Sequence, residues 1–105
     1  ATTGVPEQVP VPDALPFVLS MPENPSRSPV IFDLEAPVSG PISVRIFDVS
    51  GRALREVFGG NVESGAHRFS WNGQDELGRF VPSGVYFGAV RGQRGRATAR
   101  FVLVR

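Results

Sequence analysis

The side chains that carry out most protein chemistry are sparse in this sequence and are poorly spaced for catalysis. The single histidine, His67, has Ser64 and Ser70 near it. A nucleophilic triad needs a nucleophile, a base and a group that orients the base, all within hydrogen-bond reach. The chain has no cysteine, and nothing in its spacing supplies the remaining partners. We interpret His67 as a residue beside a turn or on the surface.

Two adjacent carboxylates, Asp75 and Glu76, are the other candidates for chemistry. Neighbouring residues point to opposite faces of a strand and splay apart in a turn, which suits neither a paired-carboxylate mechanism nor a calcium loop. We interpret the pair as turn residues, with an Asx-type hydrogen bond. Gly59 and Gly60 lack a phosphate-binding fingerprint and are expected in a loop or bulge. We therefore expect no catalytic residue, no metal, no cofactor and no enzyme activity.

Positive charge gathers near the end of the chain. All 11 basic residues are arginines, and the formal net charge is +1. Four of them, Arg91, Arg94, Arg96 and Arg100, fall in the last expected hairpin. They are interpreted as protection of an exposed sheet edge or as contacts to an anionic glycan or an acidic subunit. Nucleic acid is not expected, because the chain is nearly neutral and no exposed aromatic stacking pattern is recognisable.

Trp71 is the one candidate for a carbohydrate platform, with Asn72 and Tyr86 beside it. Aromatic faces stack on sugars, but a Trp at the end of a strand in a sandwich is more often part of the core. Glycan binding is therefore a weaker alternative, and a buried Trp71 would end it.

The elements that position these residues are predicted to be strands. Runs rich in Val, Ile and Phe alternate with polar residues, and turn-forming residues interrupt them about every ten positions. The pattern predicts an all-β, immunoglobulin-like antiparallel sandwich over residues 15–105. The expected strands lie near 15–20, 29–35, 41–49, 53–58, 66–71, 84–91 and 96–104.

Period-two patterns predict which side chains form the core. They are Val30, Phe32, Leu34; Ile42, Val44, Ile46; Phe69, Trp71; Val85, Phe87, Ala89; and Ala97, Ala99, Phe101, Leu103. With 12 glycines and 10 prolines, the chain is expected to hold at most one helical turn, near 74–77. Residues 48–51 are expected to close a hairpin, and residues 75–78 to form another tight reversal.

Residues 1–14 read as an extended, proline-rich arm or linker, because Pro6, Pro10 and Pro12 fix the backbone and remove donors. Val5, Val9 and Val11 alternate with other residues and suit docking on the edge of a neighbour's sheet. The prolines would be tolerated where their nitrogens face away from that partner. No apolar run is long enough to span a bilayer, so membrane insertion is not expected.

Several stretches together resemble one known bacterial pattern: ENP at 23–25, VRIFDVSGR at 44–52, SGAHRFSWNGQDELGRFVPSGVYF at 64–87 and ARFVLVR at the end. The order is similar to the Ig-like domain of the flagellar hook-capping protein and to the C-terminal sorting domains of type IX secretion. The resemblance implies a sandwich that works outside the cytoplasm, at the bacterial surface, in assembly, export or anchoring.

Two functions follow as hypotheses. The first is a self-associating structural subunit of a surface fibre or appendage that uses its arm for strand addition. The second is a C-terminal sorting or attachment module of a secreted protein, with residues 1–14 as the linker. The expected partners are protein subunits, either further copies of the chain or components of the envelope or secretion machinery.

Overall fold

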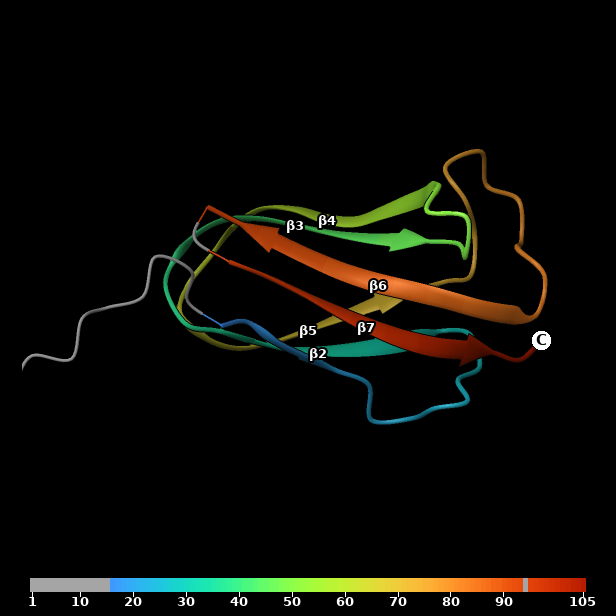
Figure 1. The fold of residues 1–105 in the computed structure, drawn as a ribbon, viewed down its shortest axis with the longest axis horizontal. Helices are drawn as coiled ribbons and strands as arrows, with labels where there is room; N and C mark the ends of the chain where they lie inside the picture. Colours follow the sequence, from blue (N-terminus) through green and yellow to red (C-terminus); the bar gives the residue numbers. More distant parts are fainter. Residues whose placement is uncertain (1–15, 94) are drawn as a thin grey trace, which may run out of the picture.

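Seven strands in two antiparallel sheets make up the described part of the chain (Figure 1). The structure is a computed structural model, and it describes residues 16–93 and 95–105. The strands are β1 (Val18–Ser20), β2 (Val30–Ala36), β3 (Gly40–Phe47), β4 (Ala53–Val62), β5 (Gly65–Trp71), β6 (Gly84–Gly92) and β7 (Arg96–Leu103). The predicted immunoglobulin-like sandwich is confirmed. The predicted arm, with Val5, Val9 and Val11, lies outside the described residues.

The smaller sheet has the order β1-β2-β5, and the larger one the order β4-β3-β6-β7. The strand β4 is longer than expected, because Gly59, Gly60 and the two residues after them continue the pairing with β3. The expectation that these glycines form a loop is therefore wrong. The pairing shifts register between Val44 and Arg45, which places a β-bulge in β4.

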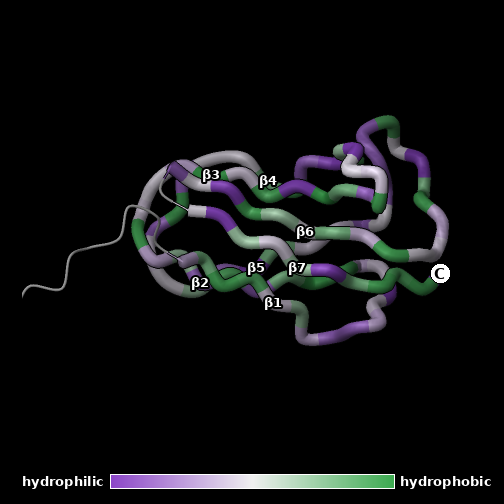
Figure 2. Tube along the Cα trace, viewed as in Figure 1, coloured by the Kyte–Doolittle hydropathy of each residue, from purple (hydrophilic) through white to green (hydrophobic). Residues whose placement is uncertain are grey.

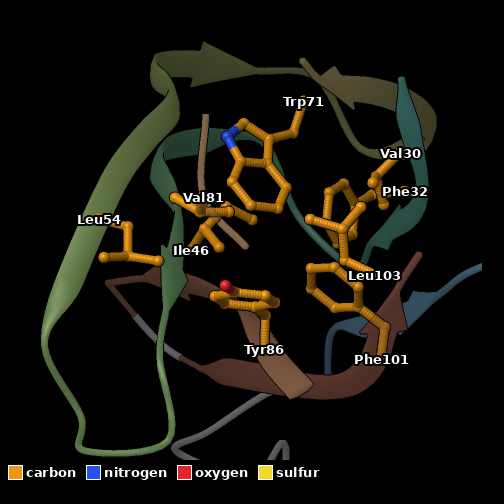
Figure 3. Close-up of a cluster of buried hydrophobic side chains, with 9 residues drawn as sticks. All are labelled: Val30, Phe32, Ile46, Leu54, Trp71, Val81, Tyr86, Phe101 and Leu103. Carbon is orange, nitrogen blue, oxygen red and sulfur yellow. The ribbon is translucent and has the colours of Figure 1, made fainter. Parts of the chain in front are cut away.

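The core lies between the sheets and is rich in aromatic rings (Figure 3). Trp71 from β5 is 2% exposed, and its ring meets those of Tyr86 and Phe101 edge-on, with centroids 5.9 and 6.0 Å apart. The polar atoms of the two amphipathic rings are satisfied: Trp71 Nε1 donates to the Gln74 carbonyl at 2.8 Å, and the Tyr86 hydroxyl donates to the Pro82 carbonyl at 2.6 Å. Burial raises the pKa of the Tyr86 phenol.

The predicted core face of β6 is wrong by one residue. Val85, Phe87 and Ala89 are only partly buried, while Tyr86 and Val90 face inward. The other inward positions, 84, 88 and 92, are glycines, so the sequence shows no apolar alternation on this face. A Cβ at Gly88 would lie 2.7 Å from Cε1 of the fully buried Phe32, so this position is glycine because the ring needs the space. The predicted inward faces of β2 and β3 are confirmed.

Two reversals use the same five-residue pattern, Asp-x-x-Gly-Arg, at residues 48–52 and 75–79. In the first, Asp48 Oδ1 accepts the backbone N–H groups of Ser50 and Arg52, at 2.9 and 3.1 Å. In the second, Asp75 Oδ1 accepts those of Leu77 and Arg79, at 2.9 and 3.0 Å. Both glycines have positive φ, 88° and 80°. The two predicted reversals and the Asx-type hydrogen bond are confirmed.

No helical turn forms at residues 74–77, which is consistent with the expectation of at most one. Gln74 instead bridges Phe80 across the reversal, and the Asp75 N–H donates to the Arg79 carbonyl at 2.9 Å. In a helix the N–H groups of Leu77 and Arg79 would donate to backbone carbonyls, but here both donate to the Asp75 carboxylate. These hydrogen bonds, that of the Arg79 N–H first, hold the pKa of Asp75 below its ordinary value.

Candidate interaction surface

The outer face of the larger sheet gathers arginines and aromatic rings in straight rows across three strands. The register places Phe47, Phe87 and Arg100 side by side in one row. The next row holds Arg45, Ala89 and Thr98, and the third Ser43, Arg91 and Arg96. Side chains directly opposite each other on neighbouring strands lie about 5 Å apart at Cβ. We call the outward side chains of these nine residues the arginine face.

Charge on the arginine face is unbalanced. Arg45 has a carboxylate partner, Glu56, with Nε 3.3 Å from Oε1. Arg91 and Arg96 stand directly opposite each other, and no described carboxylate forms an ion pair with them or with Arg100. Like charges directly opposite in a sheet are destabilising. The opposed arginines therefore lower the stability of the folded sheet slightly, and three guanidinium groups have no described carboxylate partner.

A shallow groove of about 250 Å³ runs over this face, lined by Arg45, Phe47, Ala89, Arg91 and Arg96 together with Ser43, Val90 and Thr98. The outer face of an antiparallel sheet is normally polar, and Figure 2 shows hydrophilic residues at intervals along β7, whereas most of β6 is hydrophobic or neutral. Phe47 and Phe87 depart from this pattern, since both point outward and both stay partly exposed. The surface thus combines positive charge with apolar area, the composition of a protein-binding surface.

The sequence predicted part of this surface. Arg91, Arg96 and Arg100 are exposed on one face, while Arg94 lies outside the described residues. Arg45 and the two phenylalanines were not expected to join them. In β3, the predicted inward face of Ile42, Val44 and Ile46 already implied that Arg45 and Phe47 point outward. In β6, the inward residues include glycines, so the sequence did not indicate that Phe87 points outward.

The strand β7 forms one border of this surface, and no described strand pairs with its outer edge between Arg96 and Arg100, although β1 of the other sheet approaches β7 to within 8 Å between Cα atoms. At the C-terminal end, the Val102 carbonyl accepts from the Ser26 N–H, the Val102 N–H donates to Asn24 Oδ1 and the Val104 N–H donates to the Ser26 carbonyl. Between Arg96 and Arg100, no bridge joins this edge to any described residue. The backbone groups of this edge are therefore bonded at one end and unpaired at the other, where the side chains of Thr98 and Arg100 are exposed.

The remaining candidate residues have structural roles. His67 Nε2 lies 2.6 Å from the Glu63 carbonyl oxygen, which can only accept, so this nitrogen carries the proton. Trp71 and Tyr86 are both buried, which ends the carbohydrate platform as an alternative. Glu76 Oε2 accepts the backbone N–H of Glu56 and holds the loop against β4. The described residues include no helix capable of crossing a membrane.

Residues 23–95, well over half of the chain, match the FlgD Ig-like domain family. The chain belongs to this family. It is 31% identical over 70 residues to the basal-body rod modification protein FlgD of Salmonella typhimurium, and equally to that of Salmonella typhi. The match covers 67% of this chain and 30% of each relative. The chain thus spans under a third of the length of these curated relatives.

A solved structure of PorZ, described as an essential bacterial surface component of the type IX secretion system of Porphyromonas gingivalis, is also similar. It superposes with a TM-score of 0.54 at 29% identity, over 83% of this chain and 11% of PorZ. The suspected relationship to this Ig-like group is confirmed.

The residues that carry the family resemblance serve the fold. Asn24 caps the end of β7, and Trp71 fills the core. Asn72 Oδ1 accepts the Gln74 N–H at 3.1 Å, and Asp75 organises its reversal. These residues of the family pattern therefore report how this sandwich folds.

Proposed function

We propose that this chain is a non-enzymatic structural module of a bacterial surface fibre or appendage, which joins to further copies of itself through its N-terminal arm. The observation that carries the proposal is the unpaired half of the β7 edge, beside a face on which Arg91, Arg96 and Arg100 have no described carboxylate partner. An accessible edge presents backbone donors and acceptors that an extended segment can satisfy by strand addition. We place its action at the extracellular or cell-surface side of a bacterium.

The relatives support the coarser part of this proposal. FlgD is named for modifying the basal-body rod, and PorZ is described as a surface component of a secretion system. Both descriptions concern multi-protein machinery, where an Ig-like module acts through contacts with other proteins. The described residues of this chain also direct their carboxylates mainly to turns and surface ion pairs.

Size in solution tests the assembly. The intact chain should form large oligomers or filaments in light scattering and negative-stain images. A chain beginning at Leu15 should be monomeric, and so should one with residues 1–14 replaced by glycine and serine at equal length. The buried hydrophobic side chains that are described all lie between Phe17 and Leu103, so the deletion leaves the core intact. Monomers at every concentration of the intact chain would refute the proposal.

A sorting or attachment module of a larger secreted protein is the second candidate. It is favoured by one observation, that the match to this chain covers only 30% of FlgD and 11% of PorZ. This function predicts that the chain, fused to the C-terminus of a reporter, directs its export in a bacterium with type IX secretion. A reporter that stays inside the cell, while a native sorting domain exports it, would refute this candidate.

A further inference from the structure

We propose that the β7 edge from Arg96 to Arg100 accepts residues 7–11 of a second copy, which add as an antiparallel strand with Glu7 opposite Arg100, and with Asp13 two residues beyond Arg96 on the same arginine face. This inference rests on the proposed function and names the surface that the assembly uses.

The edge offers backbone groups in a fixed alternation. The Val102 N–H and C=O point away from β6, toward Asn24 and Ser26. Successive residues of a strand direct these groups to opposite sides, and the pairing of β6 with β7 has no register shift. The N–H and C=O of Thr98 and Arg100 therefore also point away from β6, toward the accessible edge.

The arm sequence suits an edge of this kind on one side only. Its prolines stand at 6, 10 and 12, which all have the same parity. In an extended strand the nitrogens of these residues point to one side, while every N–H from residues 5, 7, 9, 11 and 13 points to the other. The odd-numbered side can pair with β7 without losing a hydrogen bond. The proline side stops a further strand from adding.

Charge then fixes the strand direction. In antiparallel pairing, the arm residues that bond to Thr98 and Arg100 share the outer face with them. Glu7 and Asp13 are odd-numbered, so they join the arginines there, and residues 1–14 contain no basic residue to oppose them. Parallel pairing would shift the register by one residue and turn both carboxylates inward, beside Ala97 and Ala99. Burying unpaired carboxylates there is costly, which favours the antiparallel arrangement.

The other sheet edges are less suitable. The edge of β4 carries a bulge, and the loop before β6 covers part of it: the Glu76 N–H donates to the Leu54 carbonyl at 2.9 Å, and Glu76 Oε2 accepts from the Glu56 N–H. The strand β1 has only three residues. The edge of β5 offers an acidic arm no unpaired arginine, because its exposed Arg68 already forms an ion pair with Asp33, with Nε 2.8 Å from Oδ1.

Charge reversal in the full chain tests the side-chain contacts. Arg96→Glu with Arg100→Glu should raise the concentration at which half of the chains are assembled by about tenfold or more, as measured by sedimentation velocity. Glu7→Arg with Asp13→Arg should do the same. A mixture of the two reversed chains should assemble again, because each arm then meets an oppositely charged face. Arg27→Glu with Arg52→Glu, at exposed positions outside residues 96–100, is the control of equal charge change; it removes the Asp48–Arg52 ion pair of one turn and should still assemble normally.

A single proline tests the backbone contacts. Thr98→Pro removes an N–H that points away from β6, so the sandwich should keep its fold by circular dichroism and lose assembly. Thr98→Ala keeps the N–H and should assemble.

The outcomes separate the two proposals. Assembly that needs the arm but survives the reversals at 96 and 100 and the proline at 98 would overturn this acceptor and leave the proposed function standing. A monomeric intact chain would overturn both. Two reversed chains that fail to assemble when mixed would overturn docking onto a second copy, because an arm bound to its own domain cannot be rescued by a partner.

Discussion

Asp48 and Asp75 have the same role at two places in the chain. Each carboxylate accepts two backbone N–H groups of its turn, and the arginine four residues later lies beside it, with Nε 3.3 or 3.5 Å from Oδ2. The hydroxyl of Ser50 adds a further bond to Asp48. This bond first, and the Arg52 N–H next, hold the pKa of Asp48 below its ordinary value. The ionised forms of both residues therefore stabilise the folded chain.

The lowered pKa values of Asp48 and Asp75 predict how the stability of the folded chain changes at low pH. A lowered pKa in the folded state means that the stabilisation is present above the unfolded pKa, near 4, and is lost as the pH falls through the folded value. Asp48→Asn with Asp75→Asn keeps the acceptor oxygens but removes the titration. The urea midpoint of this variant should depend less on pH below about 4 than that of the native chain. An unchanged pH dependence would contradict the role given to these carboxylates.

Gly88 gives a second prediction at the level of one residue. Gly88→Ala drives a methyl group into the buried Phe32 ring and should lower the free energy of unfolding by about 1–3 kcal/mol, measured by urea denaturation. Gly84→Ala is the control, because the nearest atom to its Cβ would be 4.0 Å away in Tyr86. Equal stabilities for the two variants would show that the ring does not need the space.

The same glycine marks a limit of prediction from sequence. Hydrophobic alternation identifies an inward face only where the inward residues are apolar, as in β2 and β3. In β6 the inward residues at 88 and 92 are glycines that make room for Phe32 and Phe17. The apolar signal therefore falls on the outward residues, including Phe87. Only the packing partner, supplied by another strand, reveals the true face.

At the level of the elements, β7 was predicted closely, from its bounds to its exposed arginines. Its hairpin with β6 was also expected, but the pairing of β6 with β3 was not predicted, because register between distant strands is set by the whole sandwich. The opposition of Arg91 and Arg96 follows from the pairing of β6 with β7, and that of Phe47 and Phe87 from the pairing of β3 with β6. The arginine face is thus a product of the sheet and not of a local motif.

This opposition predicts a variant that is more stable than the native chain. Arg96→Glu replaces a repulsive cross-strand pair with an attractive one and should raise the free energy of unfolding by about 0.2–1 kcal/mol. The comparison uses chains beginning at Leu15, so that assembly does not contribute. Arg27→Glu, which has no described ion-pair partner, should have a smaller effect. A less stable Arg96→Glu chain would mean that the arginines support the sheet themselves.

At the scale of the whole molecule, the proposed assembly joins two oppositely charged parts of the chain, the arginine face and the acidic segment 1–14. Contacts between arginines and carboxylates at an exposed surface are screened by salt. Assembly of the intact chain should therefore weaken as sodium chloride rises from about 0.05 to 0.5 M, as measured by light scattering. Assembly that strengthens with salt would indicate an apolar interface elsewhere.

Amide hydrogen exchange tests the central claim most directly. The N–H groups of Thr98 and Arg100 point to the accessible edge, whereas those of Ala97 and Ala99 pair with β6 and serve as internal references. In the assembled intact chain, read by quenched exchange and NMR, Thr98 and Arg100 should be protected nearly as well as their neighbours. In the chain beginning at Leu15 they should exchange much faster, with the references unchanged. Rapid exchange at both positions in the assembled chain would contradict strand addition on β7.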